Sequence, residues 1–218
     1  MDHSRRTLIA CLWLLGFLAA LLVDGPVARL VRPLHDSVKQ AEFAEEMKES
    51  GHFAFTIVVA VVLGVLHREK WRASLLLLLS GGISGLISWV IAVSVVRVRP
   101  VVRISPFEFH PFSISPFHAF HVPNLSFPSG HATLAFATAA ALSYLLPKGR
   151  WLFYCGAILC GLERIAESAH YVSDVVAAAV LGILAFRIAL TLWRWAMTRI
   201  DRAAARAPTM LGLSQTVG

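Results

Sequence analysis

The amino-acid sequence predicts an all-α, polytopic membrane protein, and three observations lead to this fold class. Hydrophobic residues make up 57% of the 218 residues, and the mean hydropathy is +0.68, whereas soluble domains contain about 45–50% apolar residues. Basic residues are concentrated in alternate connections between apolar stretches, which is typical of membrane proteins. The third observation is a succession of six apolar segments, at Thr7–Val23, Phe53–Leu66, Ala73–Val96, Ala132–Leu146, Trp151–Ile165 and Val175–Trp193.

These segments predict six transmembrane helices in a single domain over residues 1–218. Several are shorter than the roughly 20 residues that cross a bilayer, so we expect their helices to extend beyond the stated ends. Arg5 and Arg6 before the first segment loosely resemble a twin-arginine signal, but no small-x-small cleavage site follows. We therefore expect an uncleaved first helix. The three cysteines lie inside apolar segments, which predicts core residues rather than disulfides or metal ligands.

The connection over residues 24–52 predicts an amphipathic helix on the membrane surface, after the first transmembrane helix. Asp24-Gly25-Pro26 is a helix-start signal, and apolar residues recur at helical spacing between Val27 and Ala41. Pro33 is expected to kink this helix. A solvated connector is the alternative, because four glutamates follow in the second half of the stretch.

The basic residues orient the chain in the membrane. If six helices alternate in direction, all four basic clusters fall on the cytoplasmic side of a cell (inner) membrane, together with both termini. The connections at 97–128 and 166–174 then face the extracytoplasmic side. The net charge of +7 therefore indicates topology rather than nucleic-acid binding. The clusters are Arg5–Arg6, Arg68–Arg72, Lys148–Arg150 and Arg194–Arg206.

One extracytoplasmic stretch, Phe127-Pro128-Ser129-Gly130-His131, opens an apolar helix. Ser129 is a good N-cap residue, and Gly130 allows a ligand to approach the backbone closely. Free N–H groups and the positive end of the helix dipole make such a helix start an anion site. His131 adds a titratable imidazole beside it. The alternative is an ordinary capped helix with an interfacial histidine.

Two further stretches bring charged residues to the same side. Arg97 and Arg99 stand at the outer end of the third segment, where snorkelling arginines are the alternative. Arg164, His170 and Asp174 lie between the last two segments. If a helix starts near His170, Asp174 shares its face, accepts the Nδ1–H and leaves Nε2 as a nucleophile. The alternative is a capping aspartate, although a carboxylate at the mouth of an apolar helix is costly.

The connection at 100–128 is long and rich in aromatic residues and histidines. We expect a lid that dips its aromatics into the lipid interface and borders an entrance for lipid, with an ordinary interfacial loop as the alternative. A metal site is disfavoured, because no carboxylate or cysteine spacing accompanies the histidines. The residues concerned are Phe107, Phe109, His110, Phe112, Phe117, His118, Phe120, His121 and Phe127.

Together these stretches resemble the type-2 phosphatidic acid phosphatase superfamily, which includes vanadium haloperoxidases and glucose-6-phosphatase-like enzymes. Its three motifs run Lys-x6-Arg-Pro, Pro-Ser-Gly-His and Ser-Arg-x5-His-x3-Asp. The matches here are Arg99-Pro100, Pro128 to His131, and Arg164 with His170 and Asp174. By motif, the resemblance covers about residues 92–180.

The resemblance implies a metal-independent, cofactor-free hydrolase of phosphoric esters or anhydrides that works in the lipid bilayer. His170 would form a phosphohistidine, Asp174 would orient it, and His131 would protonate the leaving oxygen. The phosphate-binding residues implied are Arg99, Ser129, Gly130 and Arg164, and Arg97 is a further candidate. The implied substrates are membrane lipid phosphates: phosphatidic acid, phosphatidylglycerophosphate, a polyprenyl pyrophosphate or lipid A phosphate.

Two departures from the family pattern matter. Ala92 stands where the family has its leading lysine, so one phosphate contact is missing, and Arg97 or Arg103 is the candidate replacement. Glu163 stands where the family has serine, and it either lowers phosphate affinity or pairs with Arg164. Ala92 favours the alternative of a non-catalytic lipid-phosphate-binding relative, whereas the intact histidines favour an enzyme. A haloperoxidase-like enzyme is a second alternative, disfavoured because those relatives are typically soluble.

Overall fold

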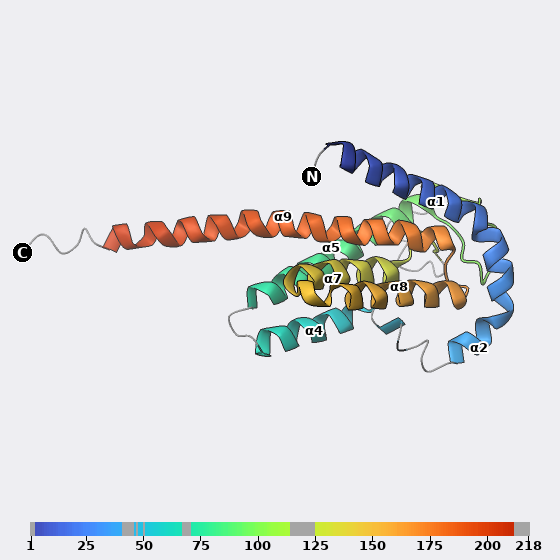
Figure 1. Ribbon diagram of the computed structural model, residues 1–218, viewed down its shortest axis with the longest axis horizontal. Helices are drawn as coiled ribbons and strands as arrows, with labels where there is room; N and C mark the ends of the chain where they lie inside the picture. The colour runs from blue at the N-terminus through green and yellow to red at the C-terminus, as the bar shows by residue number, and fades with distance from the viewer. Residues whose placement is uncertain are drawn as a thin grey trace, which may run out of the picture.

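The protein is an all-helical bundle in a computed structural model that describes residues 3–40, 46, 48–49, 51–66, 71–113 and 125–211. Within these ranges the only β-type pairings are two isolated bridges. The last helix, α9, projects far beyond the rest of the bundle (Figure 1). The elements are α1 (His3–Val31), η1 (Arg32–Leu34), α2 (His35–Gln40), α4 (Phe53–Leu66), α5 (Trp71–Val95), α7 (Gly130–Leu145), η3 (Pro147–Gly149), α8 (Arg150–Ala166) and α9 (Val172–Leu211).

Helix α7 is the centre of the bundle and packs against α5, α8 and α9. It is rich in alanine, and every residue from Ala132 to Leu142 is buried. Such small side chains let neighbouring backbones approach closely, which is how helices associate inside a bilayer. One such close approach is at Gly182 of α9, where a Cβ atom would lie 2.4 Å from the carbonyl oxygen of Thr133. The hydroxyls of Thr56 and Thr138 join α4 to α7 at 3.0 Å.

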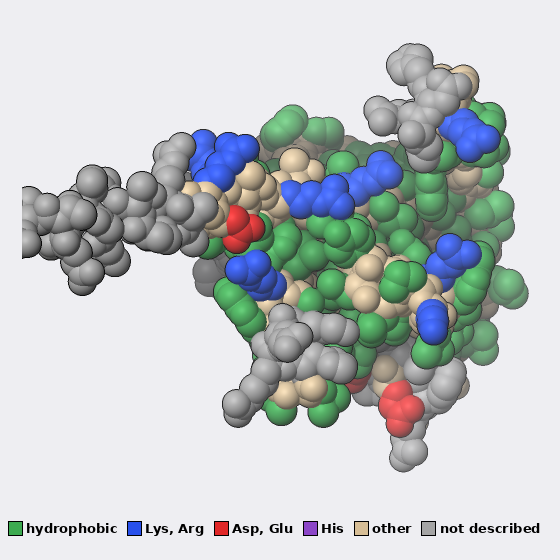
Figure 2. Space-filling view, turned by 60° about the vertical axis from the view of Figure 1, so that its left-hand side comes forward, with side chains coloured by type: hydrophobic (Ala, Val, Ile, Leu, Met, Phe, Trp, Pro, Cys, Tyr) green, Lys and Arg blue, Asp and Glu red, His purple; other side chains and the backbone are tan. Residues whose placement is uncertain are grey.

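The outer surface is strongly apolar, as the space-filling view shows (Figure 2). Large side chains such as Leu22 and Leu152 are about three-quarters exposed, a pattern that suits contact with lipid. Three helical stretches are long and apolar enough to cross a membrane: Thr7–Val38, Trp71–Val95 and Val172–Ala203. The prediction of an all-α membrane protein is confirmed at this level. The expected total of six spans additionally requires the shorter helices α4, α7 and α8.

The predicted helix start at Asp24-Gly25-Pro26 is wrong. Helix α1 continues through Pro26, and Figure 1 shows it bending over to run down the side of the bundle. A proline removes one backbone hydrogen bond and can kink a helix without ending it. Asp24 does not cap a new helix here: it is buried, and its carboxylate bonds to Arg97 and Ser173. The predicted kink at Pro33 is confirmed as the 3₁₀ turn η1, which separates α1 from α2. Most of the acidic half of this stretch lies outside the described residues.

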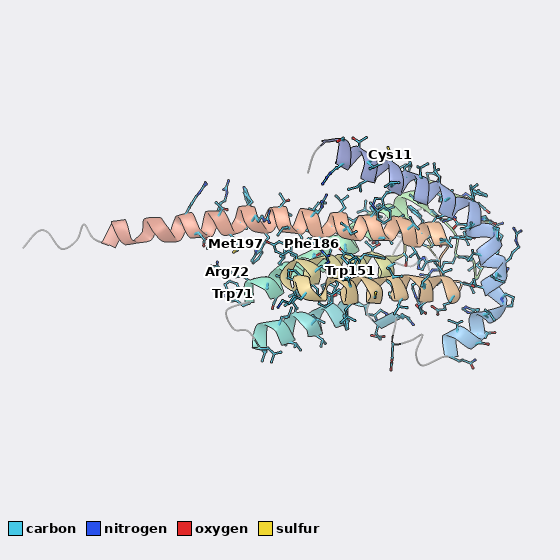
Figure 3. All side chains as sticks on the ribbon, viewed as in Figure 1. Cys11, Trp71, Arg72, Trp151, Phe186 and Met197 are labelled. Carbon is cyan, nitrogen blue, oxygen red and sulfur yellow. The ribbon has the colours of Figure 1, made fainter. Side chains whose placement is uncertain are left out.

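The predicted site segments lie together at one end of the bundle, where several helices end or begin. Helices α5 and α8 finish there, and α7 and α9 begin there (Figure 1). The opposite end holds the start of α5, where Trp71 and Arg72 lie near the projecting part of α9 that carries Met197 (Figure 3). Arg72 and Asp201 come within 3.8 Å there. Segments far apart in the sequence therefore meet at the end away from this basic region.

Candidate active site

The chain leaves α5 through a left-handed residue, Val96, with φ of 46°. A β-branched residue rarely adopts this conformation. The turn places Arg97 and Val98 in isolated bridges with Phe109 and Leu125. The N–H of Ser126 also donates to the carbonyl oxygen of Arg97 at 2.7 Å. These backbone contacts join the first arginine motif to the segment that leads into α7.

The start of α7 has the geometry expected of an anion site. Ser129 is the N-cap residue, and its hydroxyl oxygen accepts from the N–H of Ala132 at 3.4 Å. The first N–H groups of a helix have no partner within the helix, and they carry the positive end of its dipole. Gly130 is exposed, and a Cβ atom there would meet nothing within 4 Å. The backbone therefore has open space at the point where the sequence predicts an anion.

His170 lies in the turn between α8 and α9, fully enclosed. Its backbone N–H and that of Ala169 both donate to the carbonyl oxygen of Arg164, at 3.2 and 3.1 Å. Its Nδ1 lies 2.6 Å from the carbonyl oxygen of Ser126 and 3.8 Å from Oδ2 of Asp174. Since a carbonyl oxygen only accepts, Nδ1 carries the proton and Nε2 keeps its lone pair. The predicted tautomer follows, but the acceptor of the short bond is Ser126 and not Asp174.

Asp174 cannot come closer because its carboxylate is held by three other groups. Oδ2 accepts from the hydroxyl of Ser126 at 2.5 Å and from the N–H of Tyr171 at 2.8 Å. Oδ1 accepts from the guanidinium of Arg97. The bond from Tyr171 is the capping bond that an acidic residue in the first helical turn makes back to the N-cap residue. Asp174 thus stabilises the first turn of α9 and places a negative charge beside His170.

The partners of Arg97 are carboxylates of the protein, whereas the sequence predicted a phosphate as its partner. Its side chain is fully buried, and Nη2 lies 2.7 Å from Oδ2 of Asp24 while Nη1 pairs with Asp174. The ring of Tyr171 lies over the guanidinium, with the carbon Cζ 4.0 Å from the ring centroid. Both terminal nitrogens of Arg97 are therefore occupied by carboxylates, while its Nε is buried without a hydrogen-bond partner. Direct phosphate binding by Arg97 stays a prediction, and its terminal nitrogens would have to leave two carboxylates to contact a phosphate.

Arg99 and Arg164 lie close enough for their charges to repel. Burial, and then the charge of Arg164, lower the pKa of Arg99, while Glu167 and Asp174 act in the opposite direction. Nε of Arg99 donates to the carbonyl oxygen of Leu125 at 3.2 Å. An anion placed between the two guanidinium groups would relieve their repulsion.

Arg164 is held by two carboxylates. Glu163 accepts two hydrogen bonds from it, both at 2.5 Å, and Glu167 accepts a third. Of the two roles considered for Glu163, the pairing with Arg164 is the one observed. All three side chains are largely buried, so the attraction within these ion pairs is screened less than in exposed pairs. A phosphate that binds Arg164 therefore competes with two carboxylates.

His131 faces a cavity of about 650 Å³ at the start of α7. Its imidazole lies beside that of His52, with ring centroids 4.7 Å apart. The lining residues come from α4, α5 and α7 and include Gly82, Gly85 and Leu86. His52 was missed by sequence reasoning, because nothing in its neighbourhood along the chain links it to a motif. The cavity therefore leaves open space beside His131.

Neither arginine proposed as a replacement for the lysine missing at Ala92 is free. Arg97 forms ion pairs with Asp24 and Asp174. Arg103, which is more than half exposed, pairs with Glu108. In the aromatic loop, Phe107 and Phe112 are 66% and 81% exposed, as expected of side chains that dip into an interface. Phe117, His118, Phe120 and His121 lie outside the described residues. Within the described residues, no three His, Cys, Asp or Glu side chains group as metal ligands do.

Comparisons with known proteins agree with the motifs. A family model described as the PAP2 superfamily matches residues 73–199. The lipid A 1-phosphatase of Rhizobium etli is 33% identical over 180 residues, which cover 76% of this chain and 75% of that protein. Phosphatidylglycerophosphatase B of Bacillus subtilis is 29% identical over 150 residues, or 62% of this chain and 66% of that protein. The crystal structure of a transmembrane PAP2-type phosphatidylglycerolphosphate phosphatase from Bacillus subtilis shares the fold, with a TM-score of 0.57 at 24% identity, covering 83% of this chain and 93% of that one.

Proposed function

The chain belongs to the PAP2 superfamily, and on this basis we propose that it is an integral membrane phosphatase that removes a phosphate group from a membrane lipid. One observation carries the proposal. His170 holds its Nδ1–H against the carbonyl oxygen of Ser126, so Nε2 keeps its lone pair, and its backbone N–H donates to the carbonyl oxygen of Arg164, one of the two arginines of the site. This combination supplies a nucleophile and an anion site together.

In the proposed reaction, phosphate oxygens bind to Arg99, Arg164, Ser129 and the N–H group of Gly130. Nε2 of His170 attacks phosphorus, a P–N bond forms, and the bond from phosphorus to the lipid oxygen breaks. Protonated His131 gives its proton to that oxygen and becomes neutral. A water molecule then gives a proton to His131 and attacks phosphorus, the P–N bond breaks, and inorganic phosphate leaves while His170 returns to its neutral form. Fixed cations and N–H groups stabilise the charge on the transferring phosphoryl group, so we propose that no metal is needed.

Arg97 has another role in this proposal. It holds the carboxylate of Asp174 in place from a fully buried position. Asp174 in turn faces the imidazole of His170 and stabilises the positive charge that develops on it during attack. Arg97 therefore supports the nucleophile and does not bind the substrate.

The cavity beside His131 supports a lipid substrate, because its walls include apolar residues of α4, α5 and α7. Phosphatidic acid, phosphatidylglycerophosphate, polyprenyl pyrophosphate and lipid A phosphate remain the candidate substrates. The relative from Rhizobium etli, which matches about three-quarters of both chains, is a lipid A 1-phosphatase. We therefore place the 1-phosphate of lipid A first among the compounds to test.

We further propose six spans and an extracytoplasmic active site. Helices α4, α7 and α8 are about 21, 24 and 26 Å long, short of the roughly 30 Å hydrocarbon core, and polar flanking residues would complete their crossings. Arg72 and the arginines of the projecting part of α9 lie at the end of the bundle away from His170. The positive-inside rule puts that end, and both termini, in the cytoplasm.

The experiment is phosphate release from a panel of lipid phosphates in detergent, with and without EDTA, for the wild-type chain and the His170→Ala variant. We expect release by the wild type in EDTA, inhibition by vanadate, and none by the variant. Loss of activity in EDTA that an added metal restores would reject metal independence. Tight lipid-phosphate binding without release from any lipid would favour the non-catalytic alternative.

A further inference from the structure

A buried carboxylate in α1, Asp24, has no part in the reaction described above. Only 1% of its surface is exposed, and burying an unpaired carboxylate is very costly. Its oxygens accept from Nη2 of Arg97 at 2.7 Å and from the N–H and hydroxyl of Ser173 at 2.9 and 2.5 Å. Every one of these partners lies next to Asp174 in space or in sequence. Asp24 thus connects α1 to the environment of the nucleophile, although α1 lies outside the residues that the family model matches.

Arg97 lies between two carboxylates, Asp24 and Asp174, and all three side chains are fully buried. The two carboxylates and one guanidinium carry a net charge of minus one. If Asp24 were neutral, Arg97 would cancel the charge of Asp174, and the cluster would present no net charge to His170. The second carboxylate therefore decides how much negative potential reaches the imidazole, because charges in a buried site are weakly screened.

That potential matters during attack by His170. When Nε2 forms its bond to phosphorus, Nδ1 keeps its proton on the carbonyl oxygen of Ser126, and the ring becomes a positively charged phosphoimidazolium. Oδ2 of Asp174 lies 3.8 Å from Nδ1, close enough to stabilise this charge. The stabilisation is larger in the transition state than in the ground state, where the imidazole is neutral, so it accelerates the chemical step.

We propose that Asp24 is a positioning residue for this reaction: it neutralises Arg97, so that Asp174 keeps an uncompensated negative charge toward His170. The inference rests on the proposed function, since it concerns the same nucleophile. It makes α1 part of the active site, through a buried ion pair between Asp24 and Arg97, which lies two residues after the end of α5.

The test compares Asp24→Asn with the double variant Asp24→Asn/Arg97→Gln on a lipid phosphate in detergent. Asp24→Asn leaves Arg97 to cancel Asp174, so we expect kcat to fall about 10- to 100-fold with KM little changed. The double variant removes both charges and returns the cluster to minus one. We expect its kcat to recover to within about tenfold of the wild type. A purely structural role for Asp24 predicts the opposite, since the double variant breaks more of the network.

Two results overturn the inference: a kcat of Asp24→Asn within about threefold of the wild type, or a double variant no faster than Asp24→Asn. If thermal unfolding in detergent shows that Asp24→Asn does not fold, the kcat of the double variant alone tests the inference. Its kcat within about tenfold of the wild type supports the inference, and a larger loss overturns it. Wild-type turnover with an inactive His170→Ala variant secures the proposed function in the same assay. A negative result then counts against Asp24 only.

Discussion

Ser126 contacts His170 and Asp174 through different atoms. Its backbone carbonyl oxygen lies 2.6 Å from Nδ1 of His170, and its hydroxyl donates to Oδ2 of Asp174 at 2.5 Å. The carbonyl selects the tautomer of the imidazole, while the hydroxyl stabilises the charged carboxylate. Because the first contact comes from the backbone, a side-chain substitution removes only the second, and the two contributions can be separated.

Replacing Ser126 by alanine is expected to slow the reaction without abolishing it. A hydrogen bond to a charged group contributes about 1.5–3 kcal/mol, so kcat for a lipid phosphate should fall roughly 10- to 100-fold. Ser126→Thr, which keeps the hydroxyl, should lose less. Ser113→Ala is the matched control, because its hydroxyl bonds to the exposed carbonyl oxygen of His110. Wild-type kcat in Ser126→Ala would mean that Asp174 does not need this bond.

The two histidines should separate by leaving group. If His131 protonates the leaving oxygen, His131→Ala should lose about 10²–10⁴-fold in kcat on a lipid alcohol ester. On an activated aryl phosphate, whose leaving group needs no proton, the loss should be small. His170→Ala should lose activity on both substrates and form no acid-labile phosphoenzyme. Equal losses of the His131 variant on both substrates would make it a phosphate ligand, and phosphoenzyme in the His170 variant would reject the nucleophile.

Glu163 is expected to weaken phosphate binding, because it shares Arg164 with the substrate. Glu163→Gln keeps the shape and removes one of the two carboxylates on Arg164, while Glu167 still pairs with it. The KM for a lipid phosphate should therefore fall several-fold. Breaking a buried pair also destabilises a protein by up to about 3–5 kcal/mol, so thermal unfolding is measured alongside. Glu108→Gln, in an exposed pair with Arg103, is the control. An unchanged or higher KM in a folded Glu163→Gln variant contradicts this expectation.

Introducing the lysine that the family carries at Ala92 should strengthen phosphate binding. Neither Arg97 nor Arg103 is free to fill its place, so one charge-assisted contact is open, worth about 1.5–3 kcal/mol. Ala92→Lys is expected to lower the KM for a lipid phosphate, and Ala92→Met, of similar length but uncharged, is not. If both variants behave alike, length and not charge determines the effect, and the pocket departs from the family geometry.

The proposed extracytoplasmic position of the site predicts that a cysteine at the exposed Ser113 reacts with an impermeant thiol reagent on intact cells. Arg72→Cys, at the opposite end of the bundle, should react only after lysis. Both substitutions need a background without the three native cysteines, of which Cys11 and Cys155 are exposed. Labelling of Ser113→Cys only after lysis would reverse the orientation.

Local sequence patterns were sufficient where the physical signal is local. Helix α4 begins and ends where the apolar segment Phe53–Leu66 does, because polar residues flank a continuous hydrophobic run. Ser129 is an N-cap, as its position before an apolar helix predicts. Helix α9 was harder to predict, because it continues well beyond Trp193. Its later residues include many charged side chains, so the end of the apolar segment does not mark the end of the helix.

The sequence alone determined the membrane class, the helical elements and the motif residues Arg99, His131 and His170, because hydropathy, charge and spacing act over short distances along the chain. The tertiary structure decided which polar groups meet. Asp24 pairs with Arg97, 73 residues further along the chain, and the carbonyl oxygen of Ser126, not the carboxylate of Asp174, accepts the short bond from His170. Such contacts depend on how helices cross and how loops close, and in a buried site the nearest partner determines the role of a charge.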